Sequence, residues 1–329
     1  MSRACVVVPT KNEAASIASV VEEVRKGFVG SRYDDVVVIV VDDSTDSTRT
    51  RALEAGALVV RGDGDGLGAA MFKGLRAALL QDPDVIMAVD GDGQADAASE
   101  IPRFLEPIDK GEADFVLGSR FMEEGLVDYH YKSVNRFGTR VLSGMLRAQT
   151  GLDLTDSHGG IRAMKPAVAA SLEMLGTHTY VQETIIDAAE KGFRIVEIPS
   201  AWRKREHGKS RVVGSIPKYV FYTLPILLLR SGQHIRYLYS AGIISVALAV
   251  VIFLAIFVEE GFTLALGHRT PAIMLVALLV STGLQLFFFG FVLQLLKQIK
   301  KIVDRESSSW LTIEVPAAHT DKGDKTAGA

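Results

Sequence analysis

Two kinds of hydrophobic pattern divide the chain. In the first two thirds, short runs rich in valine and isoleucine end at polar or glycine residues, as strands covered on both faces do. Between them, apolar residues recur at helical spacing. The predicted strands are 4–8, 36–41, 57–60, 85–89, 114–117 and 193–198, with one more that follows the polar loop 156–162. The predicted helices are 17–24, 47–55, 71–79, 101–108, 134–145 and 183–191. This alternation predicts an α/β domain with a mostly parallel, Rossmann-like sheet, which we assign to residues 1–212.

The last third is much more apolar. Residues 237–258 and 271–296 contain no charged residue, and each stretch is long enough to cross a bilayer of ~30 Å. We therefore predict a two-helix transmembrane hairpin, preceded by an interfacial juxtamembrane segment at 213–236. Basic residues flank the outer ends of the pair, so the positive-inside rule predicts that both termini are cytoplasmic. The polar stretch 303–329 is predicted to be a disordered tail.

Composition narrows the choice of partners and compartment. The chain has 329 residues, 48% of them hydrophobic, and a net charge of -3, which argues against nucleic acid as a partner. The single cysteine, Cys5, lies in an apolar run and is expected to be buried. The N-terminus has no long apolar core before Pro9, so we expect no secretory signal. Together these features predict an integral protein of the plasma membrane whose first domain is cytosolic.

The stretch VIMAVDGDGQ is the strongest candidate for chemistry. It is a predicted buried strand that delivers Asp90, Asp92 and Gln94 to its carboxyl end, the edge where ligands collect in open α/β sheets. Two adjacent carboxylates repel each other unless a cation lies between them. An all-oxygen trio suits Mg²⁺ or Mn²⁺. The alternative is a solvated Asp-Gly turn, because D-x-D alone is a weak signal.

Other polar residues also follow strands or precede the apolar third. Asp42 and Asp43 end the second strand, where carboxylates can hydrogen-bond a ribose or base. Arg205, Lys209 and Arg211 surround Gly208 in a basic segment suited to phosphate oxygens, whereas we interpret Arg203 and Lys204 as solvated charges.

Glu183 begins a predicted helix. It is interpreted either as a ligand for a sugar hydroxyl or as an ordinary acidic residue of a first turn. His158 is interpreted as a loop residue.

The ordered set of motifs resembles the glycosyltransferase family 2 enzymes that charge a polyisoprenyl phosphate. The set comprises VVVPTKNE, VVDDSTDST, GLGAAMFKG, VDGDGQ, VLGSR, DSHGGIR and VEIPSAWRKREHGKSR, from about Val6 to Arg211. Dolichol-phosphate mannose synthases and undecaprenyl-phosphate glucosyltransferases are of this kind. Three positions depart from the usual pattern: Gly159 replaces Ser, Ile161 replaces Phe and Arg211 replaces Lys.

The resemblance implies a GT-A fold with a nucleotide sugar bound across the strand ends. It implies that Thr10, Glu13 and Asp42 hold the base and ribose, and that Asp90, Asp92 and Gln94 hold the metal and the donor diphosphate. Arg120, Arg136 and Arg205 would face the phosphates as catalytic residues together with Asp92. The remaining expected donor contacts are Pro9, Asp43, Gly68 and Glu183, and the expected lipid-phosphate contacts are Arg205, Lys209, Ser210 and Arg211.

These features predict metal-dependent, inverting transfer of a hexose from GDP-mannose or UDP-glucose to undecaprenyl or dolichyl phosphate. A lipid phosphate is already ionised at neutral pH, so its attack needs no general base. One alternative is an acceptor that is a diacylglycerol or a growing glycan, and another is a non-catalytic nucleotide-sugar-binding membrane subunit. Two helices are too few for a path across the membrane, so moving the product across needs another protein or a homo-oligomer.

Overall fold

The computed structural model describes residues 1–129, 133–174, 180–205, 233–259, 269–306 and 313–314. These fall into two compact units. The first contains the described residues up to Arg205 together with 313–314, and the second contains the two long helices of the apolar third.

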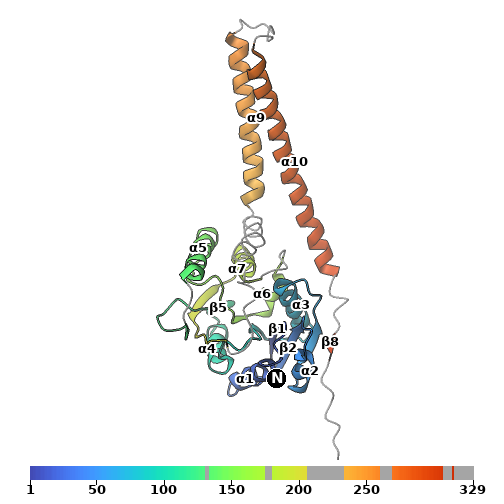
Figure 1. Cartoon of the computed structure of the whole chain (residues 1–329), viewed down its shortest axis with the longest axis vertical. Coiled ribbons are helices and arrows are strands. Elements are labelled where there is room, and N and C mark those ends of the chain that lie inside the picture. Colours follow the sequence, from blue (N-terminus) through green and yellow to red (C-terminus); the bar gives the residue numbers. More distant parts are fainter. Residues whose placement is uncertain (130–132, 175–179, 206–232, 260–268, 307–312, 315–329) are drawn as a thin grey trace, which may run out of the picture. The chain divides into compact units, whose positions relative to one another are not determined.

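A single sheet forms the centre of the first unit (Figure 1). Its strands are β1 (Ser2–Thr10), β2 (Tyr33–Asp42), β3 (Leu58–Arg61), β4 (Val85–Ala88), β5 (Phe115–Ser119), β6 (Arg162–Met164), β7 (Ile195–Pro199) and β8 (Ile313–Glu314). Their order is β7-β5-β6-β4-β1-β2-β3-β8, and only β6 and β8 run antiparallel to their neighbours. The prediction of a mostly parallel sheet is therefore confirmed.

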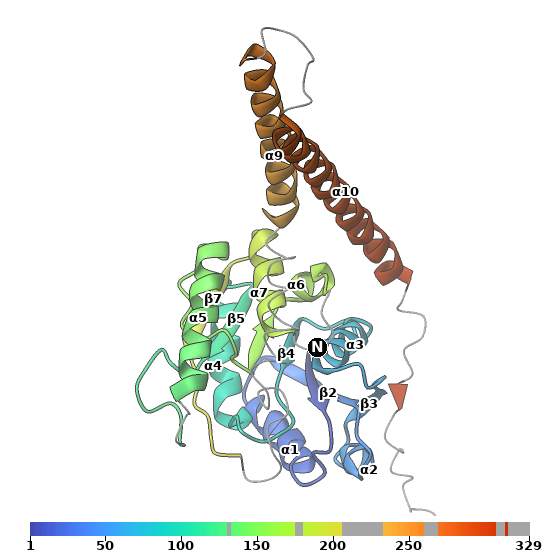
Figure 2. The ribbon, with the colours of Figure 1, turned by 45° about the horizontal axis from the view of Figure 1, so that its top comes forward.

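Helices cover both faces of this sheet (Figure 2). They are α1 (Ile17–Gly27), α2 (Thr48–Glu54), α3 (Leu67–Leu79), α4 (Ala97–Asp109), α5 (Ser133–Thr150), α6 (Pro166–Ser171) and α7 (Val181–Glu190). Val6 and Val8 of β1 point into a core cluster that includes Ile101 and Phe104 of α4.

The intervening residues of β1 face α3 instead. A Cβ on Gly74 of α3 would overlap Val7, so glycine at this position allows the helix to approach the sheet closely. Cys5 is buried as predicted, and burial raises the pKa of its thiol to about 12. Both faces of the sheet are thus dry, which explains why its strands read as continuous apolar runs.

The predicted elements are all present, with shifted boundaries. β1 and β2 extend beyond their apolar runs because polar groups pair at their starts: Arg3 lies 2.6 Å from Asp35, and its backbone N–H donates to Asp84. Helix α6 and strand β8 were not expected. The segment 303–329, predicted to be disordered, contains the end of the last helix and β8, which pairs with the edge strand β3.

The second unit is a pair of apolar helices, α9 (Gln233–Glu259) and α10 (Thr270–Glu306). They contain two stretches long and apolar enough to cross a membrane, Arg236–Glu259 and Thr270–Leu296. Small residues bring the helices together, since a Cβ on Gly242 would lie 3.0 Å from the carbonyl oxygen of Gly283. The Ser245 hydroxyl also donates to the Leu279 carbonyl at 2.7 Å.

Candidate functional site

The carboxyl ends of β1, β2 and β4 bring several predicted site residues together. Thr10 and Asp42 are register partners at the ends of β1 and β2. The loop after β4 packs against the same place, because a Cβ on Gly91 would lie 2.6 Å from the Thr10 methyl group. The Ser16 hydroxyl holds this loop by donating to the Gly91 carbonyl at 2.8 Å.

The β2 end is a preorganised acidic corner. Asp42 is 2% exposed, and its carboxylate accepts hydrogen bonds from the Thr10 hydroxyl and the Ser44 N–H, both at 3.2 Å. Asp43 accepts from the Gly64 N–H at 2.8 Å and fills the space that a Cβ on Gly62 would need. The Asp43 carboxylate therefore fixes the glycine-rich loop beside the strand ends. Pro9 at the end of β1 and Gly68 at the start of α3 are both buried.

The trio Asp90, Asp92 and Gln94 lies in the loop after β4. Asp92 accepts from the Gln94 N–H at 3.0 Å, and the Gln94 Nε2 donates to the Arg203 carbonyl at 3.3 Å. Because Nε2 is engaged, the amide oxygen of Gln94 is the atom left to ligate a cation. Burial and the neighbouring Asp92 raise the pKa of Asp90 to about 7.

These residues fit a hard divalent cation. The pKa of Asp90 is raised first by burial and then by repulsion from the Asp92 carboxylate, and a cation between the two carboxylates would relieve that repulsion. Among the described residues no group of three or more His, Cys, Asp or Glu side chains could hold a metal. Two carboxylates and the Gln94 amide, the set predicted from the sequence, are the candidate ligands in this loop.

Arg205 reaches the same loop from the far end of the domain sequence. Its guanidinium pairs with the Asp92 carboxylate and lies 3.6 Å from that of Glu13. The chain just before it is held by two loops: the Arg203 N–H donates to the Gln94 carbonyl and the Trp202 N–H to the Leu126 carbonyl, each at 2.7 Å. Arg203, expected to be solvated, also pairs with Glu23 at 2.7 Å.

A stack of cationic and aromatic groups extends from this point. The Arg120 guanidinium carbon lies 4.9 Å from the Trp202 ring centroid and 5.3 Å from that of Phe121. Arg136 of α5 lies 5.6 Å from the same Phe121 ring. Arg120 and Arg136 thus both contact the single ring of Phe121.

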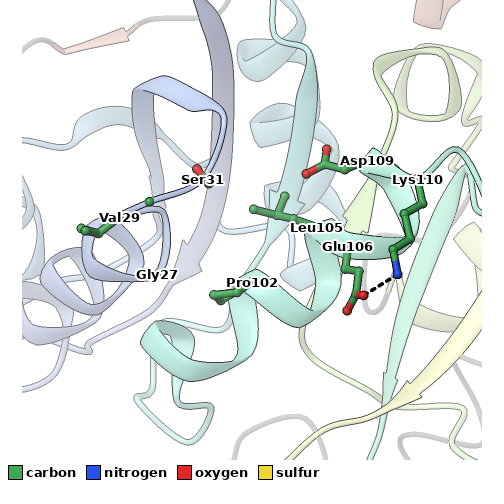
Figure 3. Close-up of a pocket in the computed structure, with 9 residues that line it drawn as sticks. Gly27, Val29, Ser31, Pro102, Leu105, Glu106, Asp109 and Lys110 are labelled. Atoms are coloured by element: carbon green, nitrogen blue, oxygen red, sulfur yellow. Dashed lines mark hydrogen bonds and ion pairs between the residues drawn. The ribbon is translucent and has the colours of Figure 1, made fainter.

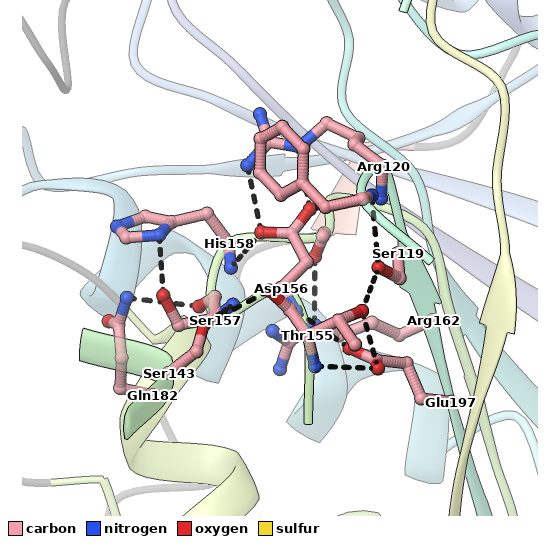
Figure 4. Close-up of polar contacts among 12 residues, drawn as sticks. Ser119, Arg120, Ser143, Thr155, Asp156, Ser157, His158, Arg162, Gln182 and Glu197 are labelled. Carbon is pink, nitrogen blue, oxygen red and sulfur yellow. Dashed lines mark hydrogen bonds and ion pairs between the residues drawn. The ribbon is translucent and has the colours of Figure 1, made fainter. Parts of the chain in front are cut away.

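Beneath the stack, a buried carboxylate orients Arg120 (Figure 4). Asp156 accepts from Arg120 Nε at 2.7 Å and from Nη2 at 3.0 Å. Burial opposes ionisation, but the Arg120 charge and hydrogen bonds bring the pKa of Asp156 below its ordinary value. Glu197 of β7 fixes the loop in turn, accepting from the Thr155 N–H and hydroxyl, each at 2.8 Å, and from the Asp156 N–H at 2.9 Å.

Two glycines complete the floor of the site. A Cβ on Gly160 would overlap the Asp90 carboxylate and lie 2.8 Å from the Trp202 ring. A Cβ on Gly159 would overlap the Gly118 carbonyl of β5, so close approach of the backbones requires glycine at this departure from the usual pattern. The lack of a side chain at Gly160 therefore leaves room for both the Asp90 carboxylate and the Trp202 ring.

Comparisons with known proteins identify the family. The model for "Glycosyl transferase family 2" matches residues 5–172. The chain belongs to glycosyl transferase family 2. An uncharacterized glycosyltransferase of Mycobacterium tuberculosis is 34% identical over 64% of this chain and 90% of the relative. An undecaprenyl-phosphate mannosyltransferase of Micrococcus luteus is 31% identical over 65% of this chain and 89% of the relative.

A solved structure shows the fold of this family 2 member. Glucosyl-3-phosphoglycerate synthase from Mycobacterium tuberculosis, in complex with Mn²⁺, UDP and phosphoglyceric acid, superimposes with a TM-score of 0.55. It is 22% identical, and the match covers 70% of this chain and 79% of that chain. The predicted GT-A fold is confirmed by this likeness together with the family match.

The structure also places residues that the sequence did not single out. Asp156 and Glu197 hold Arg120 and its loop. Trp202 lies against the Arg120 guanidinium, and the fully buried Arg162 donates to the Val181 carbonyl. The polar loop containing Asp156 was a sequence signal for the hydrogen bonds that hold Arg120. Glu197 interrupts an apolar strand, and its role is evident only from the fold. Glu183 is buried in the first turn of α7. Lys209, Ser210, Arg211 and most of the segment 213–236 lie outside the described residues.

A separate surface hollow of about 340 Å³ lies between the end of α1 and helix α4 (Figure 3). It is lined by Gly27, Val29, Gly30, Ser31, Pro102, Leu105, Glu106, Asp109 and Lys110. Its charged groups already have partners: Glu106 pairs with Lys110 at 2.6 Å, and Asp109 accepts from the Tyr33 hydroxyl at 2.7 Å. The hollow contains none of the predicted site residues of this family 2 chain.

Proposed function

We propose that this protein transfers a hexose, with inversion, from a nucleotide sugar to a polyisoprenyl phosphate at the cytoplasmic face of a membrane. The observation that carries the proposal is the meeting of a carboxylate pair and a set of arginines at one edge of the sheet. Asp92 contacts Arg205, and Gly160 lies against both the Asp90 carboxylate and the Trp202 ring, on which Arg120 stacks. Such an edge can hold a sugar diphosphate and an anionic acceptor together.

The donor would lie across the ends of β1, β2 and β4. Thr10, Glu13 and Asp42 would bind the base and ribose, and the loop fixed by Asp43 would let the ligand approach the backbone. The synthase of the same fold contains UDP, which supports a nucleotide-sugar donor here. GDP-mannose and UDP-glucose are the candidate donors.

Asp90, Asp92 and Gln94 would hold Mg²⁺ or Mn²⁺ with the donor diphosphate. When bound, such an ion supplies Lewis-acid stabilisation of the charge that develops on the leaving diphosphate. The protein would orient the ligands. The Arg203 carbonyl accepts from the Gln94 Nε2 and so sets the orientation of the amide, and Gly160 leaves room for the Asp90 carboxylate.

The arginines would bind the acceptor and the leaving group. An ionised lipid phosphate can attack the anomeric carbon directly, so the site needs cations to hold it and no general base. Arg120, held by Asp156, and Arg136, held over Phe121, present two guanidinium groups with restricted orientation. In-line attack on an α-linked donor would give a β-linked lipid. The Micrococcus relative, an undecaprenyl-phosphate mannosyltransferase, supports this acceptor class.

The apolar helices would anchor the enzyme where its acceptor resides. They are candidate spans by length and composition. After α10 the chain returns to pair β8 with β3 of the catalytic sheet, which supports entry and exit of the hairpin at the same membrane face. Together with the basic residues outside the spans, this supports cytoplasmic termini.

Reconstituted full-length protein tests the proposal. We expect labelled lipid from UDP-glucose or GDP-mannose with undecaprenyl or dolichyl phosphate, abolished by EDTA and restored by Mg²⁺ or Mn²⁺. Asp92→Asn should lower the rate by roughly 100-fold or more, because it weakens charge stabilisation at the leaving group. The exposed Asp34→Asn serves as the control.

The outcomes separate the alternatives. Absence of labelled lipid with every donor would contradict the proposal. Equal transfer to diacylglycerol, which has no phosphate, would overturn the acceptor assignment. Metal-dependent hydrolysis of the donor without acceptor would exclude a purely binding subunit.

A further inference from the structure

The outward face of α5 exposes apolar side chains. Phe137 is 69% exposed and Val141 is 47% exposed, although both belong to a well-formed helix. They lie four residues apart, and Gly144 and Ala148 continue the same stripe at helical spacing. This stripe, residues 137, 141, 144 and 148, has no large polar side chain.

A basic stripe runs beside it. Arg136, Arg140 and Arg147 are exposed and also recur at helical spacing. The helix contains no acidic residue. Arg140 makes no ion pair with any residue that the structure describes, and Arg147 lies 3.9 Å from the exposed Asp153. The outward face of α5 is therefore both apolar and cationic.

The opposite face of α5 is firmly packed, so the helix has a defined orientation. Thr139, Ser143 and Leu146 are buried, and the helix packs against α7. The Ser143 hydroxyl donates to the Thr155 carbonyl at 3.3 Å and accepts from the Ser157 N–H at 3.0 Å. Rotating α5 to hide Phe137 would break these bonds, which join the helix to the loop of Asp156.

We propose that the outward face of α5 lies on the surface of an anionic lipid bilayer. An apolar stripe beside arginines is the pattern of interfacial helices, whose apolar side chains enter the bilayer while the guanidinium groups contact lipid phosphates. The face carries the charge that such a surface attracts. Contact through this face would orient the first unit on the bilayer, because Arg136 belongs both to this face and to the stack over Phe121.

This orientation turns the arginine edge of the site toward the bilayer. A lipid phosphate could then enter from the membrane surface without leaving it. Contact of α5 with the bilayer does not depend on glycosyl transfer. An experiment can therefore contradict this contact without contradicting the proposed function, and the reverse.

A second copy of this chain is the competing occupant, and the charges disfavour it. In a two-fold dimer formed through this face, the arginine stripe of one subunit would face the arginine stripe or the apolar stripe of the other. Neither α5 helix has an acidic residue that could neutralise the arginines. An anionic surface neutralises all three arginines.

Site-specific labelling of the full-length protein tests the proposal. Val141→Cys and the control Val29→Cys, which is exposed at the end of α1, would carry an environment-sensitive maleimide dye. Cys5 is buried with a raised thiol pKa and should not react. The proteins are reconstituted in phosphatidylcholine vesicles with or without about 30% phosphatidylglycerol as the anionic component.

We expect a blue shift at position 141, and quenching by nitroxide lipids that report depths of about 5–10 Å into the headgroup boundary. Position 29 should show neither. Equal quenching at the two positions would overturn the proposal. So would a blue shift at 141 that lipid quenchers leave unchanged and that grows with protein concentration, because it would indicate a second copy.

The charge contribution has its own test. Each arginine should favour the anionic surface by about fivefold, so Arg140→Gln with Arg147→Gln should reduce quenching at 141 to the level in neutral vesicles. The matched pair Lys26→Gln and Lys110→Gln, which removes two charges at α1 and α4, should leave it unchanged. Identical quenching in both double variants would contradict the claim that Arg140 and Arg147 attract the anionic lipid surface.

Discussion

At the scale of single residues, Gly160 controls the space around Asp90. A Cβ at this position would overlap the Asp90 carboxylate and crowd the Trp202 ring. We expect Gly160→Ala to lower the transfer rate by about 100-fold, because displacing a reacting group by about 1 Å can cost that much. Initial rates with saturating donor measure the effect.

Gly138→Ala is the matched control, since nothing lies within 4 Å of the added methyl group. Circular dichroism of both variants verifies that the helices are intact. Full activity of Gly160→Ala would show that this contact does not position Asp90.

His158 predicts a pH dependence of stability. Burial lowers its pKa to about 4, from an ordinary value of about 6.5 in an unfolded chain. As the pH falls through this window, the unfolded state takes up a proton that the folded state does not. The contribution of neutral His158 to the free energy of unfolding is complete above pH of about 6.5. It is lost as the pH falls toward 4, by about 3 kcal/mol at most.

The apparent melting temperature of detergent-solubilised protein should therefore fall less steeply with pH in His158→Asn than in the wild type. Asparagine retains a polar group for the Ser157 hydroxyl, which lies 2.8 Å from His158 Nδ1. The comparison is made between pH values of about 7 and 4.5, which bracket the expected window. Parallel curves for the two proteins would contradict a buried, neutral histidine.

At the scale of elements, β7 supports the loop of Thr155 and Asp156 in the candidate site through Glu197. Its two carboxylate oxygens accept three hydrogen bonds from Thr155 and Asp156. Glu197→Gln would turn one acceptor into a donor that faces another donor, at a cost of about 1–3 kcal/mol. We expect a lower melting temperature and, because Asp156 orients Arg120, a lower kcat.

The exposed Glu112→Gln provides the comparison for Glu197→Gln. A lower melting temperature with unchanged kcat would show that Glu197 has only a structural role. An unchanged melting temperature would mean that the three hydrogen bonds contribute little.

At the scale of the whole molecule, β8 closes the open edge of the sheet. Val59 and Val60 of β3 are register partners of Glu314 and Ile313. Without β8, β3 would present unpaired backbone groups at an edge. Deleting residues 307–329 should therefore accelerate amide exchange in Leu58–Arg61, while exchange in β4 at the centre of the sheet stays slow. Unchanged exchange in β3 would indicate that β8 does not protect this edge.

The local sequence pattern determined the helices and strands of the chain and the loop that contains Asp90, Asp92 and Gln94. Apolar runs predicted the strands because both faces of the sheet are dry, and helical spacing predicted the helices. The spacing of Asp90, Asp92 and Gln94 in one turn placed three oxygen-bearing side chains in the same loop whatever the rest of the fold. The length and composition of 237–258 and 271–296 likewise predicted two candidate spans.

Only the tertiary structure decided which distant residues meet. Arg205 contacts Asp92, Arg136 stacks over the ring that Arg120 also covers, and Glu197 anchors the loop of Asp156. Such contacts depend on the order in which strands pair, and β6 inserts between β4 and β5 from much later in the chain. Local periodicity carries no information about that order, because strand pairing is set by packing across the whole sheet. The orientation of α5, and so its exposed basic and apolar face, depends on the same packing.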